Sequence, residues 1–150
     1  MNLHTSDPEK PIPEERIETL CAKIRKTRDF SGKRLLAIIP DTTRSGPTGK
    51  IFSGICKALL PRVKQLDFMV ALGTHPVMPV EKLDAFLGIN ECDRKGWLSG
   101  VNIFQHRWDK EDSLACIGMI SGAEISVISG GLLSDDITVT LNRKALEYDE

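Results

Sequence analysis

The sequence predicts an α/β domain with a mainly parallel, Rossmann-like sheet and flanking helices. Two apolar runs of strand length, at residues 35–39 and 68–72, are each followed by a polar loop and then by an amphipathic stretch. Strands that alternate with helices in this way form parallel sheets through right-handed crossovers. The length of 150 residues suits one such domain.

The first helix is expected over residues 13–24. Its apolar residues recur at the i, i+3, i+4, i+7 spacing that gives a helix one apolar face, namely Ile17, Leu20, Cys21 and Ile24. Pro13 with acidic residues directly behind it is a favourable helix start. The polar, proline-containing residues 1–12 are expected to form a loose N-terminal arm, and residues 13–150 the α/β domain.

The first strand is expected over residues 34–39 and the second over residues 66–72. A polar loop leads from the first strand into a helix expected over residues 49–63, which has an apolar stripe at i, i+4 spacing. The helix after the second strand is expected over residues 80–87, and Gly88 is well placed to end it.

The second half of the chain is expected to add strands at residues 101–104 and 137–141. Two short apolar segments lie between them, at residues 114–120 and 124–128, and a helix is expected over residues 142–148. An α/β unit normally returns from such a helix to another buried strand. Because the sequence ends shortly after this helix, we expect an incomplete domain.

The composition argues against some classes of partner. The 20 basic and 21 acidic residues leave a formal net charge of -1, which favours neither nucleic acid nor a membrane surface. The N-terminus lacks a signal-peptide pattern, and no apolar run approaches the ~20 residues that cross a bilayer. We therefore expect a soluble, cytoplasmic protein. The 4 cysteines are far apart and form no CxxC pair, which predicts reduced, structural thiols.

Ionisable side chains follow both of the first two strands. Asp41 and Arg44 come after the first strand, and His75 comes after the second. The carboxyl ends of neighbouring parallel strands open into one crevice, so we expect these side chains on one rim. A guanidinium can hold a carboxylate or phosphate bidentately, and an imidazole can move a proton near neutral pH. Asp41 could orient Arg44 or accept a hydrogen bond from a substrate hydroxyl, which predicts a site that binds an anion and moves a proton.

The same residues have simpler interpretations, which the sequence leaves open. Asp41 could cap a turn while Arg44 lies in solvent, and His75 could be a turn histidine bonded to backbone. His106 and Asp109 could mimic a second site. No nucleophile accompanies them, and a structural histidine packed beside a tryptophan is the preferred interpretation there.

The loop from Gly46 to Lys50 invites comparison with a phosphate-binding loop. The match is poor, because the loop is too short and Ile51 stands where a metal-binding hydroxyl belongs. Backbone amides at the following helix N-terminus could still hold a phosphate. The 3 scattered histidines and the cysteine spacing give no evidence for a metal held by this chain alone.

Three segments of the sequence, taken in order, resemble the N-terminal region of the lactate racemase family, the nickel-pincer-dependent 2-hydroxyacid racemases and epimerases. The matching pieces are Asp41-Thr42-Thr43-Arg44, Ala71-Leu72-Gly73-Thr74-His75, and a tail from Ser129-Gly130-Gly131 through Val139-Thr140-Leu141-Asn142-Arg143 to Tyr148-Asp149. The first two pieces are short, and their order and spacing make the resemblance specific. It covers about residues 34–150.

The resemblance implies a particular chemistry. The family uses a modified pyridinium mononucleotide that carries nickel. A histidine takes the proton from the substrate hydroxyl while hydride passes from the substrate carbon to this cofactor, and return of the hydride to the other face inverts the centre. On this basis His75 is the first of two catalytic histidines, Arg44 holds the substrate carboxylate, and Asp41 orders the pocket. The accompanying substrate- or cofactor-binding positions are Thr43, Gly73 and Thr74.

Two departures from the family pattern matter. Pro76 follows His75, where family members often carry arginine. The family's next segment leads to a PHxxxGFSGGxK-type motif that supplies the second histidine, the cofactor-anchoring lysine and then a nickel-ligating histidine. This sequence ends before that motif, and before the family's C-terminal domain.

We therefore expect that the chain alone cannot anchor the nickel cofactor and is inactive, and that a separate chain supplies the missing half. One alternative is a non-enzymatic fragment that binds a small carboxylate or a nucleotide. A second alternative is a phosphate-handling enzyme that uses the loop from Gly46 to Lys50. The sequence thus leaves open whether the chain is an enzyme.

Overall fold

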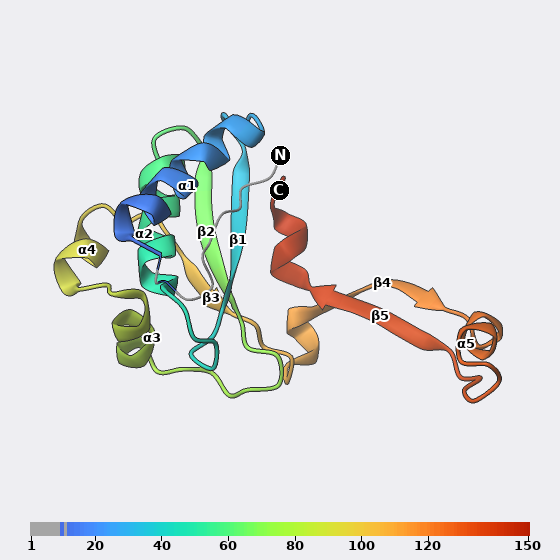
Figure 1. Cartoon of the computed structure of the whole chain (residues 1–150). Coiled ribbons are helices and arrows are strands. Elements are labelled where there is room, and N and C mark those ends of the chain that lie inside the picture. Colours follow the sequence, from blue (N-terminus) through green and yellow to red (C-terminus); the bar gives the residue numbers. More distant parts are fainter. Residues whose placement is uncertain (1–9, 11) are drawn as a thin grey trace.

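A computed structural model describes residue 10 and residues 12–150, and it shows an α/β domain built on a small parallel sheet (Figure 1). The strands β1 (Arg34–Pro40), β2 (Gln65–Ala71) and β3 (Ile103–Gln105) are hydrogen-bonded in the order β1-β2-β3. Both neighbouring pairs run parallel. The predicted fold class is confirmed, and the sheet has the small, incomplete form that the sequence predicts.

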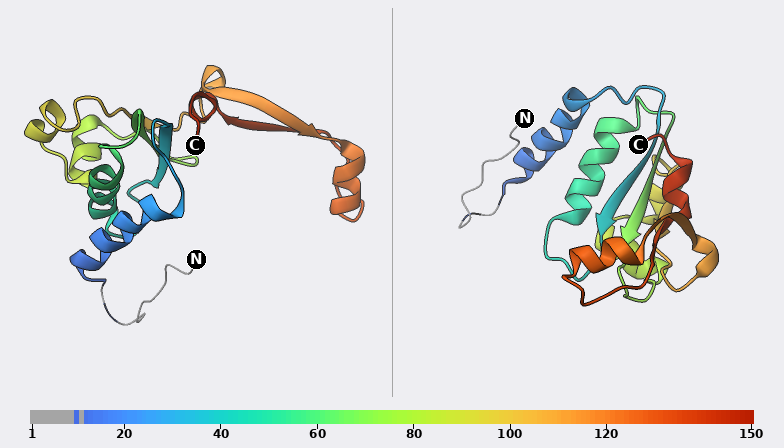
Figure 2. Two further views of the ribbon diagram at one scale, coloured as in Figure 1. Left: turned by 90° about the horizontal axis from the view of Figure 1, so that it is seen from above. Right: turned by 90° about the vertical axis from the view of Figure 1, so that its right-hand side faces the viewer.

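The helices α1 (Glu14–Thr27) and α2 (Thr48–Leu59) cover one face of this sheet (Figure 2). They lie so close together that a Cβ added to Gly54 would come within 2.8 Å of the Cys21 Sγ. Glycine at this position therefore sets how closely the two helices pack. The helix predicted to reach residue 63 ends earlier, because Pro61 has no N–H to continue the helical hydrogen bonds.

Two shorter helices follow β2. α3 (Val80–Leu87) has the predicted bounds, and Gly88 ends it in the left-handed conformation with φ 69°. α4 (Glu91–Lys95) was not predicted from the sequence. It begins with a capping box in which the side chains of Asn90 and Asp93 each accept a hydrogen bond from the other residue's backbone N–H.

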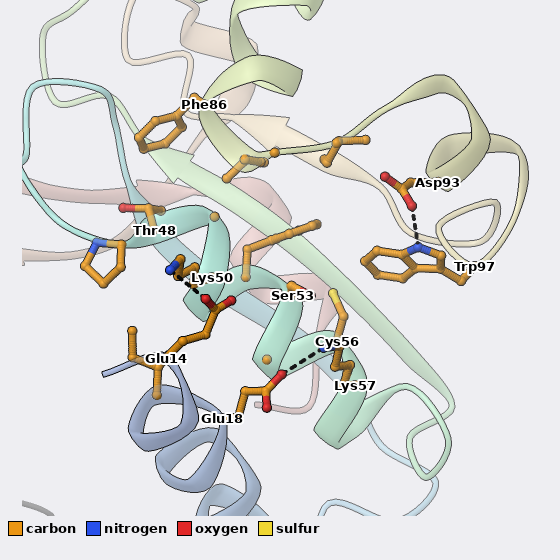
Figure 3. A pocket seen from close by; sticks show the side chains of 18 of the residues that line it. Glu14, Glu18, Thr48, Lys50, Ser53, Cys56, Lys57, Phe86, Asp93 and Trp97 are labelled. Atoms are coloured by element: carbon orange, nitrogen blue, oxygen red, sulfur yellow. Dashed lines mark hydrogen bonds and ion pairs between the residues drawn. The ribbon is translucent and has the colours of Figure 1, made fainter. Parts of the chain in front are cut away.

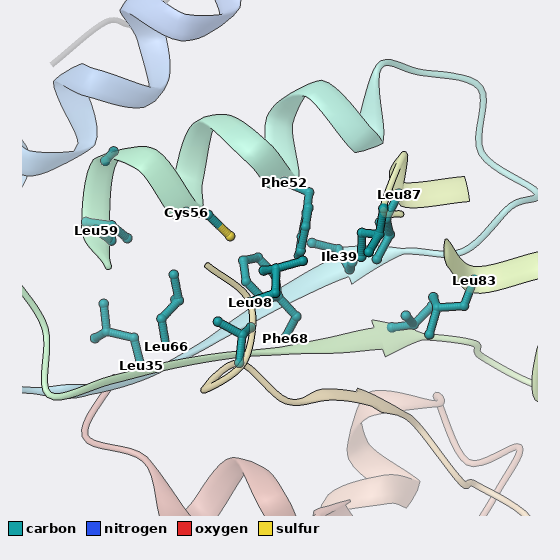
Figure 4. Close-up of a cluster of buried hydrophobic side chains, with 14 of the residues drawn as sticks. Leu35, Ile39, Phe52, Cys56, Leu59, Leu66, Phe68, Leu83, Leu87 and Leu98 are labelled. Carbon is teal, nitrogen blue, oxygen red and sulfur yellow. The ribbon is translucent and has the colours of Figure 1, made fainter. Parts of the chain in front are cut away.

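The core lies between the parallel sheet and the helices that cover it (Figure 4). β2 contributes Leu66, Phe68 and Val70, each at most 1% exposed, while α2 contributes Phe52 and Cys56. The rings of Phe52 and Phe68 pack with centroids 4.5 Å apart. This contact fixes α2 against the central strand, so the loop that leads from β1 into α2 ends at a firmly packed helix.

The opposite side of β2 carries a buried carboxylate. Asp67 is fully buried, and it accepts hydrogen bonds from the Asn102 backbone N–H (2.7 Å) and the Tyr148 hydroxyl (2.5 Å). Burial and this hydrogen bond raise the pKa of Tyr148 above its usual value. Tyr148 directly follows the 3-10 helix η2 (Arg143–Glu147), which occupies most of the segment where an α-helix was expected. The Tyr148–Asp67 bond therefore fixes the C-terminal segment against the sheet.

The last two residues lie along the outer edge of β1. The Asp149 N–H donates to the Arg34 carbonyl at 2.9 Å, and the Leu36 N–H donates to the Glu150 carbonyl at 3.0 Å. The Glu150 carboxylate also pairs with Lys33 at 2.8 Å. These contacts place the end of the sequence beside the first strand of the sheet.

A second, antiparallel sheet projects from the body of the domain (Figure 1). It consists of β4 (Leu114–Ile120), which follows the 3-10 helix η1 (Glu111–Ser113), and β5 (Ile137–Asn142). The helix α5 (Gly122–Ile128) lies at the tip between them. We call residues 114–142 the β4–β5 hairpin. The strand predicted at residues 137–141 is thus confirmed, but it pairs with β4 and does not join the parallel sheet.

Two further expectations concern the membrane and the thiols. Within the described part of the chain, no helix is both long and apolar enough to cross a membrane. All four cysteines are free, and burial raises the pKa of the Cys56 thiol to about 12. The arm predicted at residues 1–12 lies outside the described residues, apart from residues 10 and 12.

Candidate functional site

β1 and β2 bring their polar loops to one edge of the sheet. The two strands pair in register along their whole length, so Asp41 and Leu72 leave the sheet side by side. Each loop then forms a four-residue turn. The Arg44 N–H donates to the Asp41 carbonyl at 3.3 Å, and the His75 N–H donates to the Leu72 carbonyl at 3.0 Å. The rim predicted from the sequence is therefore formed by two turns at neighbouring strand ends.

The first turn holds a buried carboxylate. Asp41 is only 5% exposed, and its Oδ1 atom accepts hydrogen bonds from the Thr43 backbone N–H (3.0 Å) and the Thr43 hydroxyl (2.5 Å). This pattern, in which an aspartate bonds the backbone two residues on, stabilises a turn. Thr43 thus fixes the orientation of Asp41 and leaves its second oxygen for another partner.

The second turn depends on a glycine. Gly73 has φ 58°, a left-handed conformation that strains any residue with a side chain. A Cβ at this position would have no atom within 4 Å, so the requirement is conformational and not steric. Thr74 follows in the same turn and is exposed. The turn sets the position from which the His75 side chain leaves the backbone.

The two turns meet through one short contact between their side chains. The Nδ1 atom of His75 lies 2.6 Å from the Oδ2 atom of Asp41. The Thr43 hydroxyl, and then His75, hold the pKa of Asp41 well below its usual range, at about 2. The ionised carboxylate can only accept a hydrogen bond, so the proton of a neutral His75 ring lies on Nδ1 and its Nε2 is free to act as a base. The side chain of His75 is 53% exposed, which leaves it accessible to a substrate.

Arg44 lies in the same loop without joining this hydrogen-bonded group. Its side chain is exposed, and no described residue forms a hydrogen bond or an ion pair with its guanidinium. The carboxylate of Asp41 contacts Thr43 and His75 and makes no contact with the Arg44 guanidinium among the described residues. Arg44 keeps its five donors free for an anion.

The other sequence candidates do not join the rim. The Nδ1 atom of His106 lies 2.9 Å from the amide nitrogen of Asn142, and Asp109 pairs with Arg107 at 2.7 Å. His106 and Asp109 therefore form no pair of their own.

The loop from Gly46 to Lys50 packs tightly against the rest of the domain. A Cβ on Gly49 would lie 2.8 Å from the backbone oxygen of Leu87, and Lys50 forms an ion pair with Glu14 at 2.8 Å. The lysine of the proposed phosphate-binding loop is thus engaged by a carboxylate.

The sequence does not predict the cleft beside α2, although it singles out the loop from Gly46 to Lys50 that forms part of the lining. A cleft of about 770 Å³ lies beside α2, between α1 and the α3–α4 segment (Figure 3). Its wall is mostly apolar and includes Phe86 and Trp97, and its two lysines are paired, Lys50 with Glu14 and Lys57 with Glu18. Asp41, Arg44 and His75 do not line it. Its lining combines the whole of the loop from Gly46 to Lys50, which the sequence singles out, with helix residues whose apolar faces look like ordinary core.

The described residues offer no metal site. No group of three or more His, Cys, Asp and Glu side chains in residues 12–150 is placed to hold a metal ion. The rim supplies one imidazole and one carboxylate, and these already bond each other.

The fold and the rim define an α/β protein with a carboxylate-oriented histidine at the carboxyl ends of neighbouring parallel strands, beside an arginine that no described residue pairs. A model of the lactate racemase N-terminal domain matches residues 5–150, so the chain belongs to the lactate racemase N-terminal domain family. A search among curated proteins finds no match.

A crystal structure of a Thermotoga maritima protein from a structural genomics programme is similar to this chain. The two share 27% sequence identity with a TM-score of 0.75, and the match covers 91% of this chain. It covers 31% of the Thermotoga maritima chain, so this chain spans about a third of the length of that protein.

Proposed function

We propose that the chain is the N-terminal part of a 2-hydroxyacid racemase or epimerase similar to lactate racemase. The observation that carries the proposal is the 2.6 Å contact between His75 Nδ1 and Asp41, beside the free guanidinium of Arg44. A racemase acting on a 2-hydroxyacid needs a base near the substrate hydroxyl and a cation for its carboxylate. These two requirements match the groups at the rim.

In this proposal His75 is the base. Its Nε2 atom accepts the proton of the substrate hydroxyl, and the ionised Asp41 stabilises the imidazolium that results. Arg44 binds the substrate carboxylate through two parallel hydrogen bonds and so fixes which substrate atoms face the ring. Thr43 and Gly73 act indirectly, through the positions of Asp41 and His75, and Thr74 lies at the same rim as a contact for substrate or cofactor.

The family's nickel-pincer nucleotide, when bound, supplies the acceptor for the hydride that leaves the substrate carbon. The described residues do not fit the metal part of this cofactor, because they contain no metal-binding cluster. Nickel ligation and the second base are therefore assigned to a further polypeptide segment, which we propose can be a separate chain.

Reconstitution tests this proposal. The purified chain is mixed with the mature nickel cofactor, and the interconversion of D- and L-lactate is followed. We expect no turnover by this chain alone, and turnover once a polypeptide carrying a GFSGGxK motif is added. Clear turnover without the second polypeptide would contradict the division of the site. Activity of the reconstituted pair that survives His75→Ala would contradict the role of His75.

A second candidate function is non-enzymatic binding of a small carboxylate or nucleotide. The observation that favours it is the exposed guanidinium of Arg44 at the rim, to which no described residue bonds. Calorimetry with lactate and with nicotinate mononucleotide separates the two functions. Binding that requires Arg44, without any activity of the reconstituted pair, would favour the second candidate. The phosphate-handling alternative predicts that Lys50→Ala changes ligand binding, whereas the racemase proposal predicts no change.

A further inference from the structure

The outer edge of β1 is open along the second half of the strand. β1 comes first in the order β1-β2-β3, so no strand among the described residues lies on its outer side. Backbone groups of successive residues point to opposite edges of a strand, and the Leu36 N–H points outward, since it donates to the Glu150 carbonyl. The N–H and the carbonyl of Ile38 therefore also point outward, and no described residue bonds either of them.

The side chain of Ile38 is uncovered as well. It is 64% exposed, whereas Leu35 and Ile39, on the other face of β1, are at most 5% exposed. Parallel sheets are normally covered on both faces. A large exposed apolar side chain in the middle of a parallel strand, next to backbone groups without a partner, thus indicates a surface that a further element covers.

Residues 149–150 already follow this edge for a short distance. The Asp149 N–H donates to the Arg34 carbonyl at 2.9 Å, and the Glu150 carbonyl accepts from the Leu36 N–H, one step further along β1, at 3.0 Å. The tail therefore advances in the same direction as β1, as a parallel strand does. The Asp149 carboxylate also accepts from the Arg34 N–H at 2.8 Å. These contacts set both the direction and the starting point of a strand on this edge.

A second element points to the same side of the domain. The β4–β5 hairpin projects beyond the sheet on the side of the outer edge of β1 (Figures 1 and 2). Val127 and Leu132, in the distal part of this hairpin, are largely exposed apolar residues. This side of the domain thus carries uncovered apolar side chains at two separate places, on β1 and on the hairpin.

A second copy of the chain would meet the edge of β1 in the wrong direction. Two copies related by a two-fold axis pair a strand with itself in the antiparallel sense, whereas residues 149–150 set a parallel one. The chain also spans about a third of the length of a similar protein of known structure, so a protein of that length has further segments that can supply a strand. Strands buried in parallel sheets are apolar runs, so we expect this strand to be apolar.

We propose that the outer edge of β1 binds an extended, apolar strand of the further polypeptide segment that the proposed function requires, parallel to β1 and beside Ile38. The strand accepts the Ile38 N–H and donates to the carbonyls of Leu36 and Ile38. Because it runs parallel to β1, its carboxyl end lies at the edge of the sheet that carries Asp41 and His75, and the loop that follows it can reach the rim. The identity of this partner rests on the proposed function, whereas the open edge does not.

Hydrogen exchange of two backbone amides of β1 tests the proposal. The probe is the second polypeptide of the reconstitution experiment, joined directly to Glu150. In the chain alone we expect the Ile38 amide to exchange about tenfold faster, or more, than the hydrogen-bonded Leu36 amide. In the joined protein we expect exchange of the Ile38 amide to slow by about tenfold or more, while the Leu36 amide changes little.

Two substitutions at Ile38 test the same contact by urea denaturation. Ile38→Pro removes the outward N–H without removing a hydrogen bond to β2, because proline is tolerated on the free side of an edge strand. We expect it to lower the denaturation midpoint more in the joined protein than in the chain alone. Ile38→Val keeps the N–H and the β-branched shape, and as the matched control it is expected to affect both proteins equally. Circular dichroism checks that each variant is folded.

Three results would overturn the proposal. They are equal exchange of the Ile38 amide in the chain alone and in the joined protein, equal effects of Ile38→Pro in the two proteins, and protection of this amide that grows with the concentration of the chain alone, as a second copy on the edge predicts. Racemase activity of the joined protein is measured separately. A protected Ile38 amide without activity contradicts the proposed function alone, and activity with an unprotected Ile38 amide contradicts the docking site alone.

Discussion

Two histidines follow strands of the parallel sheet, and the partners of their rings differ. The Nδ1 atom of His75 meets the carboxylate of Asp41 at 2.6 Å, and the Nδ1 atom of His106 meets the amide nitrogen of Asn142 at 2.9 Å. A carboxylate only accepts and an amide nitrogen only donates, so the two neutral rings carry their protons on opposite nitrogens. The partner of a strand-end histidine, more than its position, determines whether the ring can serve as an oriented base.

The largest effect expected from this difference is on catalysis. In the reconstituted pair, His75→Ala is expected to lower racemase activity by about 10²–10⁴-fold, because a positioned base contributes that much to a proton-transfer step. The initial rate of D- to L-lactate conversion measures the effect.

His106→Asn is the matched control for this measurement. Asparagine keeps an acceptor oxygen in the position of Nδ1 for the hydrogen bond from Asn142, and we expect less than a few-fold change in rate. An equal loss in both variants would remove the distinction between the two histidines.

A second prediction concerns how Asp41 acts. Asp41→Asn keeps the shape of the side chain but replaces an obligatory acceptor with a group that can also donate. We expect the Nδ1–H form of His75 to lose its preference, and the rate of the reconstituted pair to fall by about 10²-fold or more. Nitrogen-15 NMR of labelled histidine reads the tautomer directly. An unchanged His75 tautomer in the variant would show that the carboxylate does not select it.

The sequence predicts the rim well because each of its two turns directly follows an apolar run that is recognisable as a strand. Apolar runs that end in Asp41 and in Gly73 locate two strand ends, and parallel pairing then places them together. The bond between Asp41 and His75 was not predicted. It depends on the side-chain rotamers of two turns 34 residues apart, which periodicity does not encode.

The sequence was least informative in the C-terminal third. The strands β4 and β5 read as ordinary strand segments, and nothing in their local pattern says that they pair with each other outside the parallel sheet. The cluster around the buried Asp67 was missed for a related reason. Its partners Asn102 and Tyr148 come from distant segments, and an aspartate within a strand gives no sign of which residues will satisfy it.

A third prediction tests whether the turn before His75 requires glycine, without changing the His75 ring. Gly73→Ala forces a side chain into φ 58° and is expected to lower the free energy of unfolding by about 1 kcal/mol. Gly46→Ala is the control, because Gly46 has no positive φ and a Cβ there would have no neighbour within 4 Å. Urea denaturation compares the two variants. Equal stability of both would mean that the turn before His75 does not require glycine.

The smallest effect is expected on the free energy of unfolding at acid pH, where the Asp41 side chain titrates and the Asn142 side chain does not. The pKa of Asp41 is about 2 in the folded chain and ~3.9 for an ordinary unfolded aspartate. A lowered pKa contributes stability that is fully present above the unfolded value and is lost as the pH falls towards the folded value. The stability difference between the wild type and Asp41→Asn should therefore shrink between about pH 4 and pH 2. For Asn142→Ala, urea denaturation over the same range should give a constant difference. A constant difference for Asp41→Asn would contradict the hydrogen-bonded, ionised carboxylate on which the role of His75 depends.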